Sequence, residues 1–201
     1  MLTTKEAIER RRSIRKFRSD PIADRILTEL LDAARLAPSG CNAQPWRFKV
    51  VKDSETKRRL AEAAFDQSFV AAAPVVLVCC ADIGGYLDGM VSGTEDLGRI
   101  GAVEDRVVKI IHRASETMRS IPLEQVGPRI ALNVAIAVEH VALRALDFGL
   151  GSCWVRLLDE QKVKGIFDWD DNMYVVALLP LGYPAETPES RKRLPLEAIT
   201  L

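Results

Sequence analysis

A group of residues near the N-terminus could bind an anion. Arg11, Arg12, Ser13 and Arg15 lie close together at the expected end of a helix. Guanidinium groups and a hydroxyl suit a phosphate, because arginine presents paired N–H donors that match phosphate oxygens. The alternative is a solvated helix end, whose cations are favoured by the helix dipole. Taken alone, the segment does not decide between these interpretations.

Two further segments have the composition of a binding site. Residues 38–46, PSGCNAQPW, combine prolines, a glycine and small polar side chains. This predicts an irregular loop with groups that can bond a planar polar heterocycle. Near the C-terminus, residues 182–184 (GYP) are followed by a basic run at 191–193 (RKR). The alternatives are a plain turn for the loop and a flexible charged tail for the basic run.

Common catalytic signatures are absent from the sequence, which has no GxSxG, no P-loop and no HExxH. Residues 149–154, GLGSCW, begin like a dinucleotide-binding fingerprint. They follow a predicted helix and enter a strand, however, whereas that fingerprint follows a strand and opens a helix. We therefore interpret them as a helix C-cap and a tight turn. His112 is isolated, and His140 lies in an apolar helix, where a hydrogen-bonded core or interface histidine is expected.

The composition is that of a folded globular protein without a strong net charge. The chain has 201 residues, of which 48% are hydrophobic, and its 28 basic residues balance its 28 acidic ones. This balance argues against nucleic acid or an anionic membrane as the main partner. The first residues have no apolar signal core, so we expect a cytoplasmic protein. Its four cysteines are expected to be buried thiols, neither paired in disulfides nor bound to a metal.

Hydrophobic periodicity and turn residues predict helices and strands mixed in one domain, of the α+β or α/β class. Helices are expected at residues 4–12, 23–36, 53–64, 103–118, 128–148 and 159–166. Strands are expected at residues 46–51, 74–80, 152–156 and 173–181. Pro128 suits the first turn of the long helix and Gly149 its left-handed C-cap. Polar residues interrupt that helix, so we expect a core helix and not a membrane span.

In this order and spacing, the segments resemble the nitroreductase family of FMN-dependent oxidoreductases. The matching segments are residues 11–17 (RRSIRKF), 37–46 (APSGCNAQPW), 73–76 (APVV), 149–154 (GLGSCW), 181–184 (LGYP) and 191–193 (RKR). The resemblance implies an α+β fold, with a central mixed β-sheet flanked by helices, in an interlocked homodimer with two FMN sites at its interface. It also implies a single FMN-binding domain over residues 1–201, in which residues 82–125 are a variable lid or insertion.

The resemblance gives the basic segments a place along the cofactor. The residues implied at the phosphate of FMN are Arg11, Arg12, Ser13, Arg191 and Arg193. Arg15 is implied beside the N1 and O2 edge of the flavin. A fixed cation there stabilises the negative charge that reduction places on N1.

Other residues are implied around the flavin ring. Those implied to reach the flavin of the other subunit are Pro38, Ser39, Gly40 and Asn42. Gln67 is implied near the ribityl chain or the ring. Beside flavin N5, where the family often has small residues or an acid followed by glycine, this chain has Arg156 and Leu157. A backbone N–H of either residue can still donate to N5, but we expect the bulkier side chains to narrow the pocket or alter nicotinamide docking. Asn133 stands where the family often has an acid.

The implied function is an FMN-dependent NAD(P)H oxidoreductase. Hydride from NADH or NADPH would pass through flavin N5 to a nitroaromatic, a quinone or a similar electron-poor acceptor. No side-chain general acid is evident, so water would supply protons, and no metal is expected. Two alternatives stay open at this point. One is a specialised flavin reaction on the same scaffold, such as reductive dehalogenation or flavin breakdown, and the other is a flavin-binding protein without catalysis.

Overall fold

The centre of the sheet is strand β2 (Val75–Asp82), whose side chains are buried on both faces except at its last residue. The computed structural model describes residues 1–200. Strands β1 (Trp46–Val51) and β4 (Met173–Gly182) flank β2, and the short strand β3 (Gly151–Ser152) pairs with the end of β4. All three pairings are antiparallel. A continuous apolar run therefore marks the innermost strand, as predicted.

The α+β class is confirmed, but the expectation of a mixed sheet is wrong for the strands described. Their one parallel neighbour within residues 1–200 is an isolated bridge between Ser13 and Ser152. This bridge comes from the segment after the first helix, which runs beside β3 without forming a strand of its own. The sheet is therefore antiparallel, with a single parallel contact at its β3 edge.

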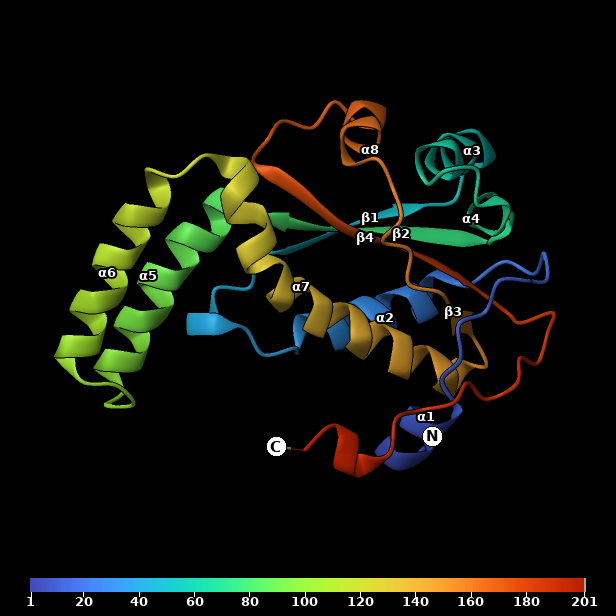
Figure 1. Ribbon diagram of the computed structural model, residues 1–201, viewed down its shortest axis with the longest axis horizontal. Helices are drawn as coiled ribbons and strands as arrows, with labels where there is room; N and C mark the ends of the chain where they lie inside the picture. The colour runs from blue at the N-terminus through green and yellow to red at the C-terminus, as the bar shows by residue number, and fades with distance from the viewer. Residues whose placement is uncertain (201) are drawn as a thin grey trace.

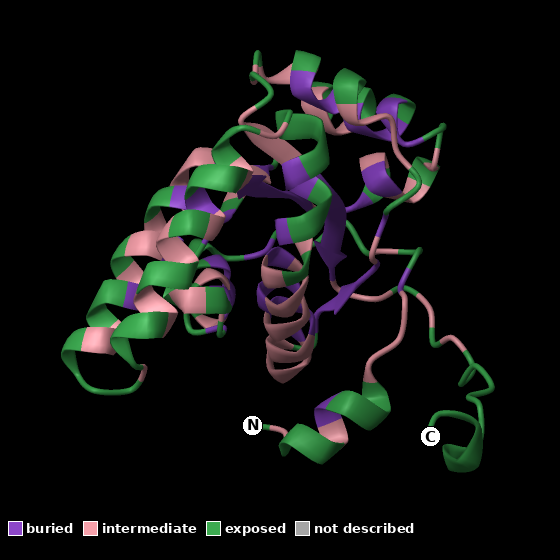
Figure 2. Cartoon of the chain, turned by 60° about the vertical axis from the view of Figure 1, so that its left-hand side comes forward, coloured by how far each residue is buried: buried purple, intermediate pink, exposed green. Residues whose placement is uncertain are grey.

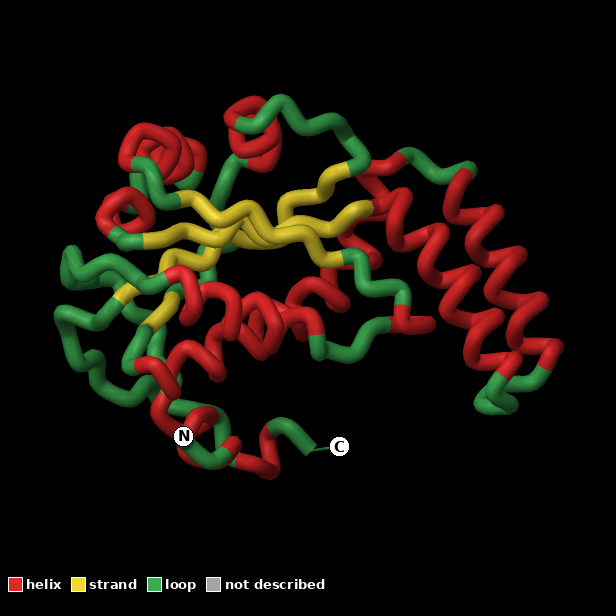
Figure 3. The backbone as a smooth tube through the Cα atoms, turned by 180° about the vertical axis from the view of Figure 1, so that it is seen from behind, coloured by secondary structure: helices red, strands yellow, loops and turns green. Residues whose placement is uncertain are grey.

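Helices cover both faces of the sheet (Figure 1, Figure 3). Helices α2 (Asp24–Arg35) and α7 (Leu123–Ala145) lie on one face. Helices α3 (Ser54–Ala63), α4 (Ser68–Ala72) and α8 (Glu160–Ile166) lie on the other. Each face needs this cover because the central strands present apolar side chains in both directions.

Alternate residues of β2 belong to different hydrophobic clusters, as the period of two along a strand requires. Val75 and Leu77 pack with residues of α2 and α7. Val76 and Val78 pack with residues of α3, α4 and α8. Figure 2 shows the sheet as the most deeply buried part of the chain. The two clusters hold the sheet between its helix layers, and burial of this apolar surface is the main stabilising contribution.

Three predicted boundaries differ from the observed ones. Helix α1 (Thr4–Arg10) ends two residues early, and Thr3 caps it by accepting from the Glu6 N–H. The strand expected at 152–156 is reduced to β3, followed by an isolated bridge at Val155. Pro128 lies inside α7 and not in its first turn, because the helix starts at Leu123.

The long helix continues as a 3-10 turn, η2 (Leu146–Phe148), and ends at Gly149. Gly149 has φ 69°, the left-handed C-cap that the sequence predicts. The apolar segment Leu123–Phe148 has the length and composition of a membrane-spanning helix. It packs against α2, β2 and β4, so it is the core helix that its polar residues predict.

Residues 82–125 form a helical arm that projects from the body (Figure 1). It consists of α5 (Ile83–Arg99) and α6 (Asp105–Arg119), which lie side by side. Helix α6 agrees with the predicted helix at 103–118. Helix α5 has no counterpart among the predictions. It contains five glycines, and each glycine lowers helix propensity by about 1 kcal/mol relative to alanine.

Two of these glycines allow α5 to contact the loop that carries the short 3-10 turn η1 (Gly40–Asn42). A Cβ atom at Gly93 would lie 1.7 Å from the Cys41 carbonyl oxygen, and one at Gly89 would lie 2.6 Å from the Ala43 oxygen. Backbone thus packs against backbone where no larger residue fits. The arm and this loop are a single packed unit.

The chain's last 3-10 turn, η3 (Leu196–Ala198), lies in the exposed C-terminal tail.

We expect Gly93→Ala to destabilise the protein by about 1–3 kcal/mol, the usual cost of inserting a methyl group where neither neighbour can yield. Gly165→Ala, in helix α8, is the matched control, since a Cβ atom added there would meet nothing within 4 Å. The control should be neutral or stabilising by about 0.5–1 kcal/mol. Denaturant unfolding of both variants at one protein concentration measures the difference. Equal stability of Gly93→Ala and wild type would show that α5 does not constrain the loop.

Candidate functional site

The two ends of the chain meet at the β3 edge of the sheet. After α1 ends, the Ile14 N–H donates to the Ser152 carbonyl at 2.9 Å. Further along, the Arg18 N–H donates to the Tyr183 carbonyl, also at 2.9 Å. The Ala185 N–H returns a bond of 2.9 Å to the Lys16 carbonyl. The early end of α1 is what leaves this segment extended and free to pair with the beginning of the C-terminal tail.

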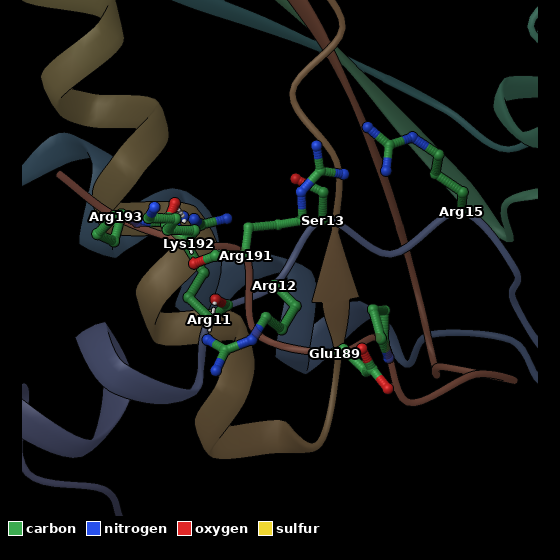
Figure 4. Close-up of a pocket in the computed structure, with 9 residues that line it drawn as sticks. Arg11, Arg12, Ser13, Arg15, Glu189, Arg191, Lys192 and Arg193 are labelled. Atoms are coloured by element: carbon green, nitrogen blue, oxygen red, sulfur yellow. Dashed lines mark hydrogen bonds between the residues drawn. The ribbon is translucent and has the colours of Figure 1, made fainter.

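The meeting of the two ends encloses a basic cavity of about 490 Å³ (Figure 4). Its lining residues are Arg11, Arg12, Ser13, Arg15, Pro188, Glu189, Arg191, Lys192 and Arg193. Five arginines and one lysine thus face a single glutamate. The two basic segments that the sequence sets far apart are brought together here, and all five residues expected at a phosphate line this cavity, as does Arg15.

Arg11 is held in place by an acid of the core helix. Its Nε lies 3.6 Å from a carboxylate oxygen of Glu139, and the other oxygen accepts from Trp154 Nε1 at 3.1 Å. Glu139 therefore ties the basic segment at residues 11–15 to the chain that follows β3. Arg12 is fixed differently, because its Nη1 donates to the carbonyls of Glu9 and Arg11 at 2.7 and 2.8 Å. These contacts limit the positions that the two guanidinium groups can take.

Arg15 occupies the opposite side of the cavity from Arg193 (Figure 4). Its guanidinium carbon lies 5.8 Å from the centre of the Phe69 ring, within the range of a cation–π contact. Its backbone N–H donates to Glu186 at 2.6 Å. The neighbouring Cys153 thiol is a buried free thiol, and burial raises its pKa although Arg15 acts in the opposite direction. Cys153 is therefore a neutral thiol at physiological pH.

The loop of residues 38–44 lies elsewhere. Pro38, Ser39, Gly40 and Asn42 do not line the basic cavity of their own chain. The Ser39 hydroxyl accepts from the Gln44 N–H at 3.0 Å, and the Gly40 N–H donates to Asn133 Oδ1 at 2.9 Å. Asn133 thus positions this loop from α7, opposite the glycine face of α5. Cys41, Asn42 and Gln44 all have positive φ, so the loop keeps its shape only under these contacts.

Gln67 and the segment at 156–157 form a third group, which does not line the basic cavity either. Gln67 Nε2 donates to the Leu157 carbonyl at 3.0 Å and to the Ala64 carbonyl at 2.8 Å. The Arg156 guanidinium bonds to carbonyl oxygens of β4, at 2.5 Å for Val176. The side chain of Arg156 is therefore engaged with the sheet and does not point freely into solvent.

The sequence matches the Nitroreductase family over residues 8–183. The chain belongs to the nitroreductase family. It is 38% identical to an NADH dehydrogenase of Thermus thermophilus, over all of this chain and 96% of that one. It is 28% identical to an FMN reductase [NAD(P)H] of Bacillus subtilis, over 94% of this chain and 68% of that one. Among solved structures, it superposes on the NADPH:FMN oxidoreductase of Vibrio harveyi complexed with NAD+, with a TM-score of 0.75 and 25% identity, over 98% of this chain and 76% of that one.

Several residues of this nitroreductase-family site were not predicted from the sequence. Glu139 and Glu186 anchor the cationic segments, and Glu189 is the one acid in the cavity wall. An acid inside the apolar stretch of α7 was the signal that could have identified Glu139, whose side chain is 42% exposed and so available to a neighbouring cation. Glu186 and Glu189 carry no such signal, since acids in an exposed tail are common.

Proposed function

We propose that the chain is an FMN-dependent NAD(P)H oxidoreductase that binds the FMN phosphate in the basic cavity. The observation that carries this proposal is the convergence of residues 11–15 and 191–193 around one space. A phosphate monoester carries about −1.5 to −2 charges and three acceptor oxygens, which suits a set of guanidinium donors and a hydroxyl. The relatives named as an FMN reductase and as an NADPH:FMN oxidoreductase support the same cofactor.

The residues present fit FMN at the ring end as well. The backbone N–H groups of Arg156 and Leu157 have no hydrogen-bond acceptor among residues 1–200. Both residues are exposed, so these N–H groups are free to donate to an acceptor atom of a bound ring. Leu157 is 65% exposed, so a flat molecule can approach this segment from solvent.

When bound, FMN supplies hydride transfer at N5, from NADH or NADPH to a second molecule. The chain supplies position and charge. The residues proposed at the phosphate are Arg11, Arg12, Ser13, Arg191 and Arg193. Arg15 contributes a fixed cation at the ring end, and Gln67 acts on the ring by holding the backbone of Leu157. No side chain is assigned as a proton donor, so water delivers protons. We propose nitroaromatics, quinones and similar electron-poor rings as acceptors, in a cytoplasmic protein without nucleic acid or membrane partners.

The working unit that we propose is a homodimer. The loop residues Pro38, Ser39, Gly40 and Asn42 are too well fixed by α5 and α7 to reach the basic cavity of their own chain, so a second copy is needed to bring such a loop to the cofactor. Apolar side chains are exposed where the copies would meet, among them Leu36 just after α2 and Leu132 on α7. Leu36 also lines a groove whose apolar residues are Leu2, Ala7, Ala33, Leu36 and Leu143 and whose polar residues are Thr3, Thr4, His140, Arg144 and Asp147.

Purification tests the function directly. We expect a yellow protein that retains FMN and not FAD, because the cavity suits a terminal monophosphate. Adding NADH or NADPH without oxygen should bleach the bound flavin, and a nitroaromatic or a quinone should restore its colour. A protein that cannot bind added FMN would contradict the cofactor. Bound FMN that neither nucleotide bleaches would indicate a flavin-binding protein without this activity.

We expect Arg15→Ala and Arg193→Ala to differ in their effects, because the two side chains lie on opposite sides of the cavity. Arg15→Ala removes a cation from the ring end, where negative charge develops only on reduction. It should lower the midpoint potential and slow reduction. A charged hydrogen bond contributes about 1–3 kcal/mol, and each ~1.4 kcal/mol lost from the transition state slows the reaction tenfold. Arg193→Ala should mainly weaken FMN binding. Redox and FMN titrations of both variants measure this, and the reversed pattern would reverse the proposed orientation of the cofactor.

Light scattering on the purified holoprotein tests the dimer. We expect twice the chain mass at low micromolar concentration. Leu36→Glu should shift the mass towards the monomer, because it places a charge in an apolar contact. Ile100→Glu, in the turn between α5 and α6, is the control, since Ile100 is similarly exposed and does not line the groove. A flavin-loaded monomer in the wild type would exclude the interface as part of the site.

A further inference from the structure

Strand β4 contains an irregularity where it pairs with β2. β4 pairs with β2 in a register that shifts between Cys79 and Cys80. Cys79 lies opposite Ala177, but Cys80 lies opposite Val175, so Val176 is an extra residue in the ladder. Such a β-bulge leaves a residue unpaired and disrupts the ladder locally. In a buried strand, the carbonyl groups at the bulge need another donor.

Arg156 is that donor. Its Nη1 donates to the Val176 carbonyl at 2.5 Å and lies 3.3 Å from the Val175 carbonyl. Carbonyls of consecutive strand residues ordinarily point to opposite sides, and the bulge is what lets one guanidinium nitrogen meet both. The backbone just before Arg156 is also tied to β4, because Val155 and Leu178 exchange two hydrogen bonds, at 2.9 and 3.0 Å. The side chain of Arg156 and the backbone of the preceding residue therefore both form hydrogen bonds with β4.

The other side of this segment is tied to the helix layer. Gln67 Nε2 bridges the carbonyls of Leu157 and Ala64. Two residues later, the Asp159 N–H donates to the Ala63 carbonyl at 2.7 Å. Residues 155–159 are therefore fixed by contacts to β4 on one side and to the end of α3 on the other. Between these contacts, the N–H groups of Arg156 and Leu157 have no acceptor among residues 1–200.

We propose that Arg156 and Gln67 are positioning residues that hold this segment so that one of the two N–H groups donates to N5 of bound FMN. The inference rests on the proposed function and deepens it. A donor fixed before the ligand arrives costs no reorganisation when the ligand binds or reacts. Arg156 therefore acts through the backbone that it clasps. Its guanidinium group binds β4 carbonyls; whether Arg156 and Leu157 narrow the pocket or alter nicotinamide docking stays a prediction.

The test compares Arg156→Met, Arg156→Lys and Gln67→Met with wild type. Hydrogen exchange of a peptide covering residues 153–159 is measured by mass spectrometry in the apoprotein. It shows how firmly Arg156 and Gln67 hold this segment when no cofactor is bound. We expect about tenfold faster exchange in Arg156→Met and Gln67→Met. In the FMN-loaded enzyme, both should slow anaerobic reduction by NADH or NADPH about tenfold, since the backbone donor to N5 is no longer held in place. The dissociation constant of FMN should change less than threefold, and the visible spectrum of bound FMN should shift.

Two controls separate positioning from general damage. Arg156→Lys retains a cation that can reach the bulge and should recover part of the rate and of the protection. Arg106→Met removes an exposed arginine of α6 and should change none of these quantities. The effects of Arg156→Met and Gln67→Met should combine less than additively, because both hold one segment.

Three results would overturn the inference. The first is wild-type exchange at residues 153–159 in Arg156→Met. The second is a raised KM for NADPH alone, which would place Arg156 on the dinucleotide. The third is a loss of FMN affinity with an unchanged reduction rate, which would place it at the cofactor's phosphate. Failure of the wild type to bind FMN would instead contradict the proposed function, and the exchange experiment would still decide whether Arg156 and Gln67 anchor the segment.

Discussion

Six cationic side chains around one cavity repel one another, and the rest of the site is built around this concentration of like charge. The acids nearby offset it only in part. Glu189 lies in the wall, while Glu139 contacts Arg11 and Glu186 binds the backbone at Arg15. These carboxylates orient the segments but leave an excess of positive charge. A phosphate dianion, as we propose for this cavity, would offset most of that excess.

Strand β4 connects this cavity to the proposed ring site. At its last residues it pairs with β3, and the chain beyond it runs beside the extended segment that follows α1. That arrangement brings the two arginine clusters together. Near its middle, the bulge at Val176 takes the Arg156 guanidinium and fixes the chain after β3. One buried strand therefore positions groups at both ends of the proposed FMN site, and apolar side chains pack on both of its faces.

Regular elements were predictable where the periodicity is strong, as in β2 and α2, because burial on defined faces imposes a repeat on the sequence. Helix α5 was not predictable, since Gly89 and Gly93 are selected by contact with a loop distant in sequence. The cation clusters could be recognised by composition and resemblance. Their anchors could not, because the pairing of Glu139 with Arg11 depends on tertiary packing. The contacts of Arg156 could not be predicted either, because its hydrogen bonds to the bulge depend on the register between β2 and β4.

The comparison of FMN with riboflavin tests the central role of the phosphate most directly, because the two ligands share the ring and differ only in that group. Calorimetric or fluorescence titration of the apoprotein gives both dissociation constants. We expect riboflavin to bind at least about a hundredfold more weakly, since several charge-assisted hydrogen bonds are lost, and we expect added salt to narrow the gap by screening. Equal affinity for the two ligands would contradict a phosphate site where the chain ends meet.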